Sequence, residues 1–232
     1  MRILLISSSY NSLTQRAHVE LTDAGHEVSI ELAISAEHMI TAVELFEPDL
    51  IIAPMLTKAI PKHIWSRYTC LIVHPGIMGD RGPSALDWAI MERPQEWGVT
   101  LLQAVAEMDA GDIWATRTFP MRDGSKGSIY RREVSDAAIA CIHEALEKFQ
   151  APDFKPRPLD YSAPDVLGQE RPLTTQLDRY LDWSADTDTV LRRLWSADGS
   201  PGVLEIFGQD AVYLYGAHRE SQLHGEPGQF IG

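Results

Sequence analysis

A histidine and an aspartate that each follow an apolar run are the residues of this chain best placed for acid–base chemistry. His74 comes directly after the β-rich run 69–73, and Asp109 lies in the turn after the run 98–105. In an open α/β sheet, side chains at the carboxyl ends of the strands face a common crevice where ligands bind. An imidazole with an unperturbed pKa near about 6.5 can move a proton at neutral pH. The sequence therefore predicts that His74 and Asp109 form a catalytic pair.

Each of these two residues also has a plain structural interpretation, which stays open at this point. His74 could bond a backbone carbonyl at the strand end, and Asp109 could serve the turn Asp-Ala-Gly, because aspartate favours turns. Pro75 and Gly76 turn the chain sharply and leave the ring accessible, which favours the catalytic interpretation. Asp112 is the competing carboxylate, and its spacing indicates a structural role.

The elements that must position the pair alternate between strand and helix over the first 75 residues. Buried apolar runs predict strands, and capping residues, glycine and proline mark the helix ends. This alternation is typical of βαβ units, so we expect an α/β fold with a Rossmann-like, mainly parallel sheet. The expected strands are 2–9, 27–32, 50–53 and 69–73, and the expected helices are 12–24, 36–46 and 61–67.

Beyond His74 the pattern predicts more elements of the same unit. They are helix 84–91, strands 98–105 and 113–120 as an edge hairpin, and the amphipathic helix 127–149. Neighbouring parallel strands deliver their carboxyl ends to one edge of a sheet. We therefore expect one crevice at the ends of four strands, namely Ser7, Pro54, His74 and Val105.

The rest of the chain differs in composition. Residues 151–172 contain five prolines and predict an extended linker between residues 1–150 and 173–232. The last part predicts an incomplete α+β unit, because one helix and one hairpin make a poor core and the chain is expected to be cut short within it. Its expected elements are helix 177–195, the hairpin 202–207 with 211–215, and a strand that begins in 225–232.

Composition limits the class of protein and its partners. The net charge is -13, whereas nucleic-acid binders need a basic surface, so no nucleic acid is expected as a partner. No apolar run approaches the roughly 20 residues of a membrane span, and no membrane partner is expected. Cys70 and Cys141 both lie in apolar settings, which indicates a cytoplasmic protein without disulfides.

Two kinds of site find little support in the sequence. His143-Glu144 lacks the second histidine of a zinc-binding H-E-x-x-H pattern, so no metal is predicted. Gly76, Gly79 and Gly82 do not have the spacing of a dinucleotide-binding loop.

Three motifs resemble those of a known family. Val73-His74, Arg81-Gly82 and the run from Met108 to Asp112 are similar to the folate-dependent formyltransferases, over roughly residues 1–150. The resemblance implies that His74 and Asp109 are the catalytic residues and that 10-formyltetrahydrofolate is the formyl donor. It also implies a folate site in the loop after His74 and beside the run 98–105. The expected folate-binding residues are Pro75, Gly76, Ile77, Met78, Arg81, Gly82, Leu102 and Ala104.

One departure points to a particular type within the family. Ile72 stands where the family has a catalytic asparagine, and the loss of such a donor typically costs about 10²–10³ in rate. The variant sequence 72–90, with Leu-Asp-Trp-Ser at 181–184, resembles the hydrogenase maturation (HypX or HoxX) type. This type implies synthesis of the carbon monoxide ligand of the nickel–iron site by way of formyl-coenzyme A. Its implied partners are coenzyme A, bound through an enoyl-CoA hydratase-like half absent here, and hydrogenase maturation proteins.

Alternative functions remain compatible with the same residues. Within the family they are a methionyl-tRNA formyltransferase or a formyl-tetrahydrofolate hydrolase. An alternative of another class is a folate-binding or scaffold domain that has lost its chemistry, which Ile72 makes plausible.

Overall fold

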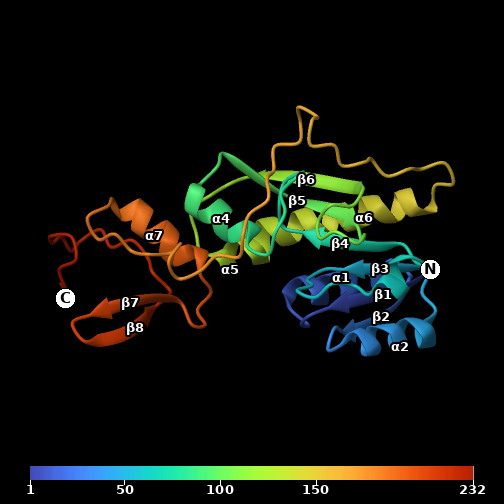
Figure 1. Cartoon of the computed structure of the whole chain (residues 1–232), viewed down its shortest axis with the longest axis horizontal. Helices are drawn as coiled ribbons and strands as arrows, with labels where there is room; N and C mark the ends of the chain where they lie inside the picture. The colour runs from blue at the N-terminus through green and yellow to red at the C-terminus, as the bar shows by residue number, and fades with distance from the viewer. Residues whose placement is uncertain (232) are drawn as a thin grey trace.

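A six-stranded sheet with helices on both faces forms the larger part of the molecule (Figure 1). The computed structural model describes residues 1–231, and the strand order is β2-β1-β3-β4-β5-β6. The strands are β1 (Arg2–Ser7), β2 (Glu27–Leu32), β3 (Leu50–Ala53), β4 (Cys70–His74), β5 (Glu96–Gln103) and β6 (Ile113–Pro120). The helices between them are α1 (Ser12–Asp23), α2 (Ala36–Phe46), α3 (Lys62–Trp65) and α4 (Ala85–Glu92).

Each face of the sheet has its own apolar core, because successive side chains of a strand point to opposite faces. Ile3 and Leu5 of β1 pack in one core with α1, α4 and the long helix after β6. Leu4 and Ile6 pack in the other core with α2 and α3. The expected Rossmann-like, mainly parallel sheet is confirmed, since β1 to β4 pair in parallel.

The direction of β5 differs from the expectation. It runs antiparallel to β4, so that Thr100 lies opposite His74, and Gln103 at its carboxyl end lies opposite Leu71. The carboxyl end of β5 therefore points away from that of β4, and the expected parallel direction of this strand was wrong. Val105 nevertheless lines the same cavity as Pro54 and His74. The edge hairpin of β5 and β6 is confirmed.

The amphipathic helix expected after the hairpin is interrupted by a wider turn. It consists of α5 (Lys126–Ile129), a π-helical segment η1 (Tyr130–Val134) and α6 (Ser135–Gln150). Single π turns inside α-helices are rare and are often found at functional sites. Here the segment brings Tyr130 and Val134 to the large cavity described below.

The C-terminal part is a small group of elements at one side of the sheet (Figure 1). It contains α7 (Thr187–Ser196) and the antiparallel hairpin of β7 (Val203–Phe207) and β8 (Asp210–Leu214). Leu181, Leu194 and Val203 form its buried cluster. Residues 151–172 contain no helix or strand beyond isolated bridges to Arg81 and Ile113.

Two expected elements of this part do not form as predicted. The helix expected from residue 177 begins only at Thr187, because local side chains satisfy the backbone before it. Asp182 accepts from the backbone N–H of Ser184, and Asp186 accepts from that of Thr189 as the N-cap. Residues 225–231 form no strand, and Gly232 lies outside the described residues.

Both cysteines are buried and free, which leads to a prediction about their reactivity. Burial raises the pKa of the Cys70 and Cys141 thiols to about 12, so almost no reactive thiolate exists at neutral pH. We expect neither thiol to react with a thiol-specific reagent at pH 7.5 in the folded protein, and both to react in denaturant. Rapid labelling of the folded chain would contradict this.

Within the described part of the chain, no helix combines the length and the apolar character needed to cross a membrane.

Candidate functional site

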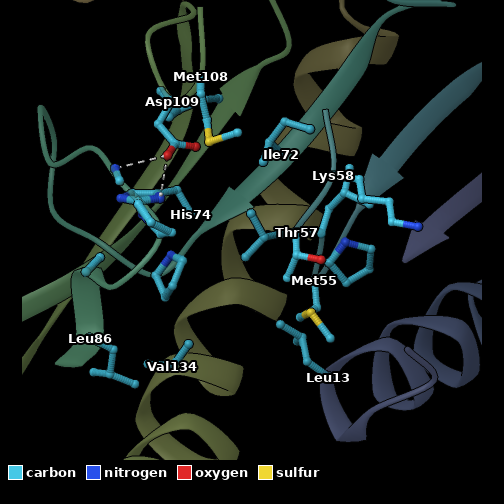
Figure 2. Close-up of a pocket in the computed structure, with 18 of the residues that line it drawn as sticks. Leu13, Met55, Thr57, Lys58, Ile72, His74, Leu86, Met108, Asp109 and Val134 are labelled. Atoms are coloured by element: carbon cyan, nitrogen blue, oxygen red, sulfur yellow. Dashed lines mark hydrogen bonds and ion pairs between the residues drawn. The ribbon is translucent and has the colours of Figure 1, made fainter. Parts of the chain in front are cut away.

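His74 is buried at the end of β4 between two carboxylates. Its Nε2 lies 2.9 Å from Oδ1 of Asp80, and its Nδ1 lies 3.5 Å from Oδ2 of Asp109. The side chains of His74, Asp80 and Asp109 are only 4%, 2% and 10% exposed. The structure therefore brings together the two residues that the sequence placed in a pair (Figure 2).

Asp109 reaches His74 through an excursion of the chain between β5 and β6. Residues 104–112 leave the end of β5 and return to it, where Gln103 donates its N–H to the carbonyl of Asp112. Gly111 makes the return possible, because a Cβ there would lie 1.8 Å from the Gln103 carbonyl oxygen. At the tip, Asp109 has a positive φ of 53° and accepts a 3.3 Å hydrogen bond from the Gly82 N–H. The loop 104–112 thus brings Asp109 back to His74, although β5 itself runs away from it.

Arg81 fixes this excursion from the neighbouring loop. Its guanidinium donates to Glu107 at 2.7 Å and to the carbonyl of Met108 at 3.3 Å. These contacts hold the residues that precede Asp109, so Arg81 acts on the site without lining the cavity.

Asp80 was missed by the sequence analysis. Burial raises the pKa of its carboxyl, and the hydrogen bond with His74 acts in the opposite direction. The signal available in the sequence was that Asp80 is the one acidic residue in the loop 75–82. Its six-residue distance from His74 did not reveal that the loop folds back onto the imidazole.

A cavity of about 1000 Å³ opens beside His74 and Asp109. Figure 2 shows Ile72, Thr57 and Lys58 along one side, and Leu13, Val134 and Leu86 along another. In the sheet register, Ile72 lies between Ala53 of β3 and Leu102 of β5. The cavity therefore has a slot with Ile72 at its base, between the loop 54–60 and the segment 102–109.

The expected folate-binding residues divide into two groups. Pro75, Gly82, Leu102 and Ala104 line the cavity, and Gly76, Ile77, Met78 and Arg81 do not. The loop 54–60 lines it as well and was not singled out from the sequence, where its one signal was its place after an expected strand.

The loop residues outside the lining have packing roles. A Cβ on Gly76 would lie 2.5 Å from Nε2 of His74, so glycine is required for the close approach of the loop. Ile77 packs against the apolar core near Gly98. The carbonyl of Met78 accepts a 2.9 Å hydrogen bond from the Gly168 N–H.

A group of charged side chains borders the far part of the cavity. Nζ of Lys126 lies 2.9 Å from Asp87 and 3.0 Å from Asp198, and all three residues line the cavity. Burial alone would lower the pKa of Lys126, but the two carboxylates raise it above its usual value. Within residues 1–231, no group of three or more His, Cys, Asp and Glu side chains is arranged to hold a metal ion.

Fold and site together define a Rossmann-like α/β domain with a histidine–aspartate pair facing a large cavity. A family model described as formyl transferase matches residues 31–146, which is half of the chain. The chain therefore belongs to the formyl transferase family.

Similar proteins include longer ones. The hydrogenase maturation factor HoxX of Bradyrhizobium diazoefficiens is 50% identical over all 232 residues, which cover 41% of that protein. The crystal structure of HypX from Aquifex aeolicus in complex with tetrahydrofolic acid is 48% identical, with a TM-score of 0.92 over 99% of this chain and 40% of that one. The chain thus spans about two fifths of the length of these two relatives.

The fold extends to more distant proteins. A methionyl-tRNA formyltransferase from Clostridium thermocellum has a TM-score of 0.79 at 18% identity, over 95% of this chain and 94% of that one. This match concerns the fold alone.

Proposed function

We propose that this chain takes the formyl group from 10-formyltetrahydrofolate, as one step in hydrogenase maturation. The observation that carries the proposal is the contact of His74 with Asp109 at a cavity large enough for a folate. The family membership and a 48% identical HypX structure that holds tetrahydrofolic acid support it.

The proposed place of the folate ring is the slot above Ile72. The loop 54–60 lines the slot with main-chain groups, and apolar side chains such as Met55 and Leu102 lie next to them. A pterin edge requires such groups within an apolar pocket. His74 follows Ile72 on the same face of β4, so the formyl group of a folate in this slot would lie next to the imidazole.

His74 is the proposed proton-transfer group, and Asp109 stabilises its charged form. The imidazole would take the proton from the attacking acceptor atom and give it to the folate nitrogen that leaves. Ile72 offers no donor for the formyl oxygen, and the Gly82 N–H already donates to Asp109. The donor therefore has to come from another main-chain group near the cavity or from the acceptor substrate.

The proposed acceptor is the thiol of coenzyme A. The product, formyl-coenzyme A, would supply the carbon monoxide ligand of a nickel–iron hydrogenase. The support for this route is the 50% identity to a hydrogenase maturation factor. The route also needs a hydratase-like unit, which the sequence resemblance implies for proteins of this type.

The test combines calorimetry with product analysis. We expect tetrahydrofolate to bind, and formyl loss from 10-formyltetrahydrofolate to require coenzyme A and to yield formyl-coenzyme A. Coenzyme A is added in large excess, because the hydratase-like half implied to bind it lies outside these 232 residues. The net charge of -13 predicts no gel shift with initiator tRNA, even at low salt. A salt-sensitive gel shift with initiator tRNA, together with formylation of that tRNA, would indicate a tRNA formyltransferase. Formyl loss with water as the only acceptor would indicate a hydrolase. Folate binding without turnover would indicate a scaffold.

A further inference from the structure

The two carboxylates beside His74 make unequal contacts. Asp80 forms a 2.9 Å hydrogen bond with Nε2, whereas Asp109 lies 3.5 Å from Nδ1, at the limit of a hydrogen bond. We propose that Asp80 is a positioning residue that keeps the imidazole hydrogen on Nε2, so that Nδ1 is the atom that accepts the proton. This inference rests on the proposed function and adds a residue to its mechanism.

Burial explains why the contact with Asp80 determines the tautomer. A buried carboxylate needs a donor, since its desolvation is otherwise costly. Within the described residues, His74 is the only group that forms a hydrogen bond with the Asp80 carboxylate. A neutral imidazole carries one N–H, and beside an ionised Asp80 this N–H points to the carboxylate. The lone pair of Nδ1 then faces Asp109.

The main chain holds Asp80 in this place. Its N–H donates to the carbonyl of Ile77 at 3.0 Å, which closes a tight turn of the loop. A strap formed by residues 166–171 packs on the outside of that turn. The Gly168 N–H donates to the carbonyl of Met78 at 2.9 Å, and the Arg171 N–H donates to the carbonyl of Arg81 at 2.9 Å. A Cβ on Gly168 would lie 1.8 Å from the Asp80 nitrogen, so the two backbones are in direct contact.

The chemical step then uses one nitrogen of His74. The attacking thiol loses its proton to Nδ1 as its sulfur bonds to the formyl carbon. The proton passes from Nδ1 to the folate nitrogen as the bond between that nitrogen and the formyl carbon breaks. While Nδ1 carries the proton, both nitrogens donate, Nε2 to Asp80 and Nδ1 towards Asp109. The two carboxylates thus stabilise the imidazolium that forms during transfer.

The tautomer can be measured on the wild-type chain by long-range ¹⁵N–¹H correlation of its histidine rings, with the His74 signal identified by its loss in His74→Ala. We expect the hydrogen on Nε2. In Asp80→Asn we expect the Nε2-protonated form to lose its dominance, because the amide can also donate to Nε2. We further expect formyl release to fall at least about 10²-fold, while the Kd for tetrahydrofolate changes little. Asp23→Asn, at an exposed position outside the cavity lining, is the matched control and should keep the wild-type tautomer and the wild-type rate.

Three results would overturn the proposal. They are a wild-type His74 with its hydrogen on Nδ1, an Asp80→Asn variant with the wild-type rate, or one that loses activity while the tautomer stays unchanged. If Asp80→Asn does not fold, the tautomer of His74 in the wild type decides whether the proposal stands. If the wild type releases no formyl group, the proposed function fails, and the ring signals still test the role of Asp80.

Discussion

Replacing His74 with alanine is expected to slow formyl release from 10-formyltetrahydrofolate by about 10²–10⁴-fold, the range of general acid–base catalysis. The variant loses the one imidazole in contact with Asp109, and no other histidine lines the cavity within the described residues. Folate binding should be largely retained, because the slot above Ile72 remains. The measurement is single-turnover formyl release with saturating 10-formyltetrahydrofolate and coenzyme A, and calorimetry measures folate binding.

The same substitution has a cost in stability that must be separated from catalysis. Without His74, the buried Asp80 loses its hydrogen-bond partner, which costs about 1–3 kcal/mol. Rates should therefore be compared at a temperature where thermal melting shows both proteins folded. His224→Ala, at an exposed position, is the control and should keep the wild-type rate. Unchanged formyl release in His74→Ala would remove this residue from the mechanism.

Replacing Gly168 with alanine is expected to impair the site from outside the cavity. The new Cβ would lie 1.8 Å from the Asp80 nitrogen and 2.3 Å from the Gly79 carbonyl carbon, and both are main-chain atoms. The strap or the loop must therefore shift, and overpacking of this kind costs about 1–3 kcal/mol. Because the loop carries Asp80, we expect a lower melting temperature together with at least about a tenfold loss of formyl release, since a misplacement of about 1 Å can cost 10²-fold.

Gly199→Ala is the matched control for this change. The nearest heavy atom to its new Cβ is Cδ2 of Tyr215 at 3.8 Å, an ordinary contact. Both variants add the same methyl group, so the difference between them reports the contact of strap and loop. A Gly168→Ala protein with the melting temperature and the rate of the wild type would show that the strap does not position the loop.

The strands and helices were largely determined by local sequence. The expected bounds of 27–32, 36–46, 50–53 and 113–120 agree with β2, α2, β3 and β6. In these segments the strands coincide with runs rich in apolar residues. The helix α2 begins at the capping residue Ser35, whose hydroxyl accepts a hydrogen bond from the N–H of His38. Local patterns failed at 177–186, where side-chain hydrogen bonds such as that of Asp182 replace a helix.

The pairing of His74 with Asp109 was expected from the sequence, but the stated reason was wrong. The apolar run of β5 is buried on both faces, and such a run has the same pattern whichever way the strand points. The antiparallel pairing with β4 sends the end of β5 away from His74. Only the folded loop 104–112, closed by Gly111 and held by Arg81, returns Asp109 to the imidazole.

The sequence by itself determined the β-α-β alternation, the two apolar faces of the sheet and the histidine and aspartate of the candidate pair, because each depends on neighbours within a few positions. Only the tertiary structure decided the environment of His74. The prolines of 151–172 predicted an extended segment, but they could not show that Gly168 packs on Asp80. Contacts across about 90 positions depend on which surfaces meet when the chain folds, and a local pattern does not encode them.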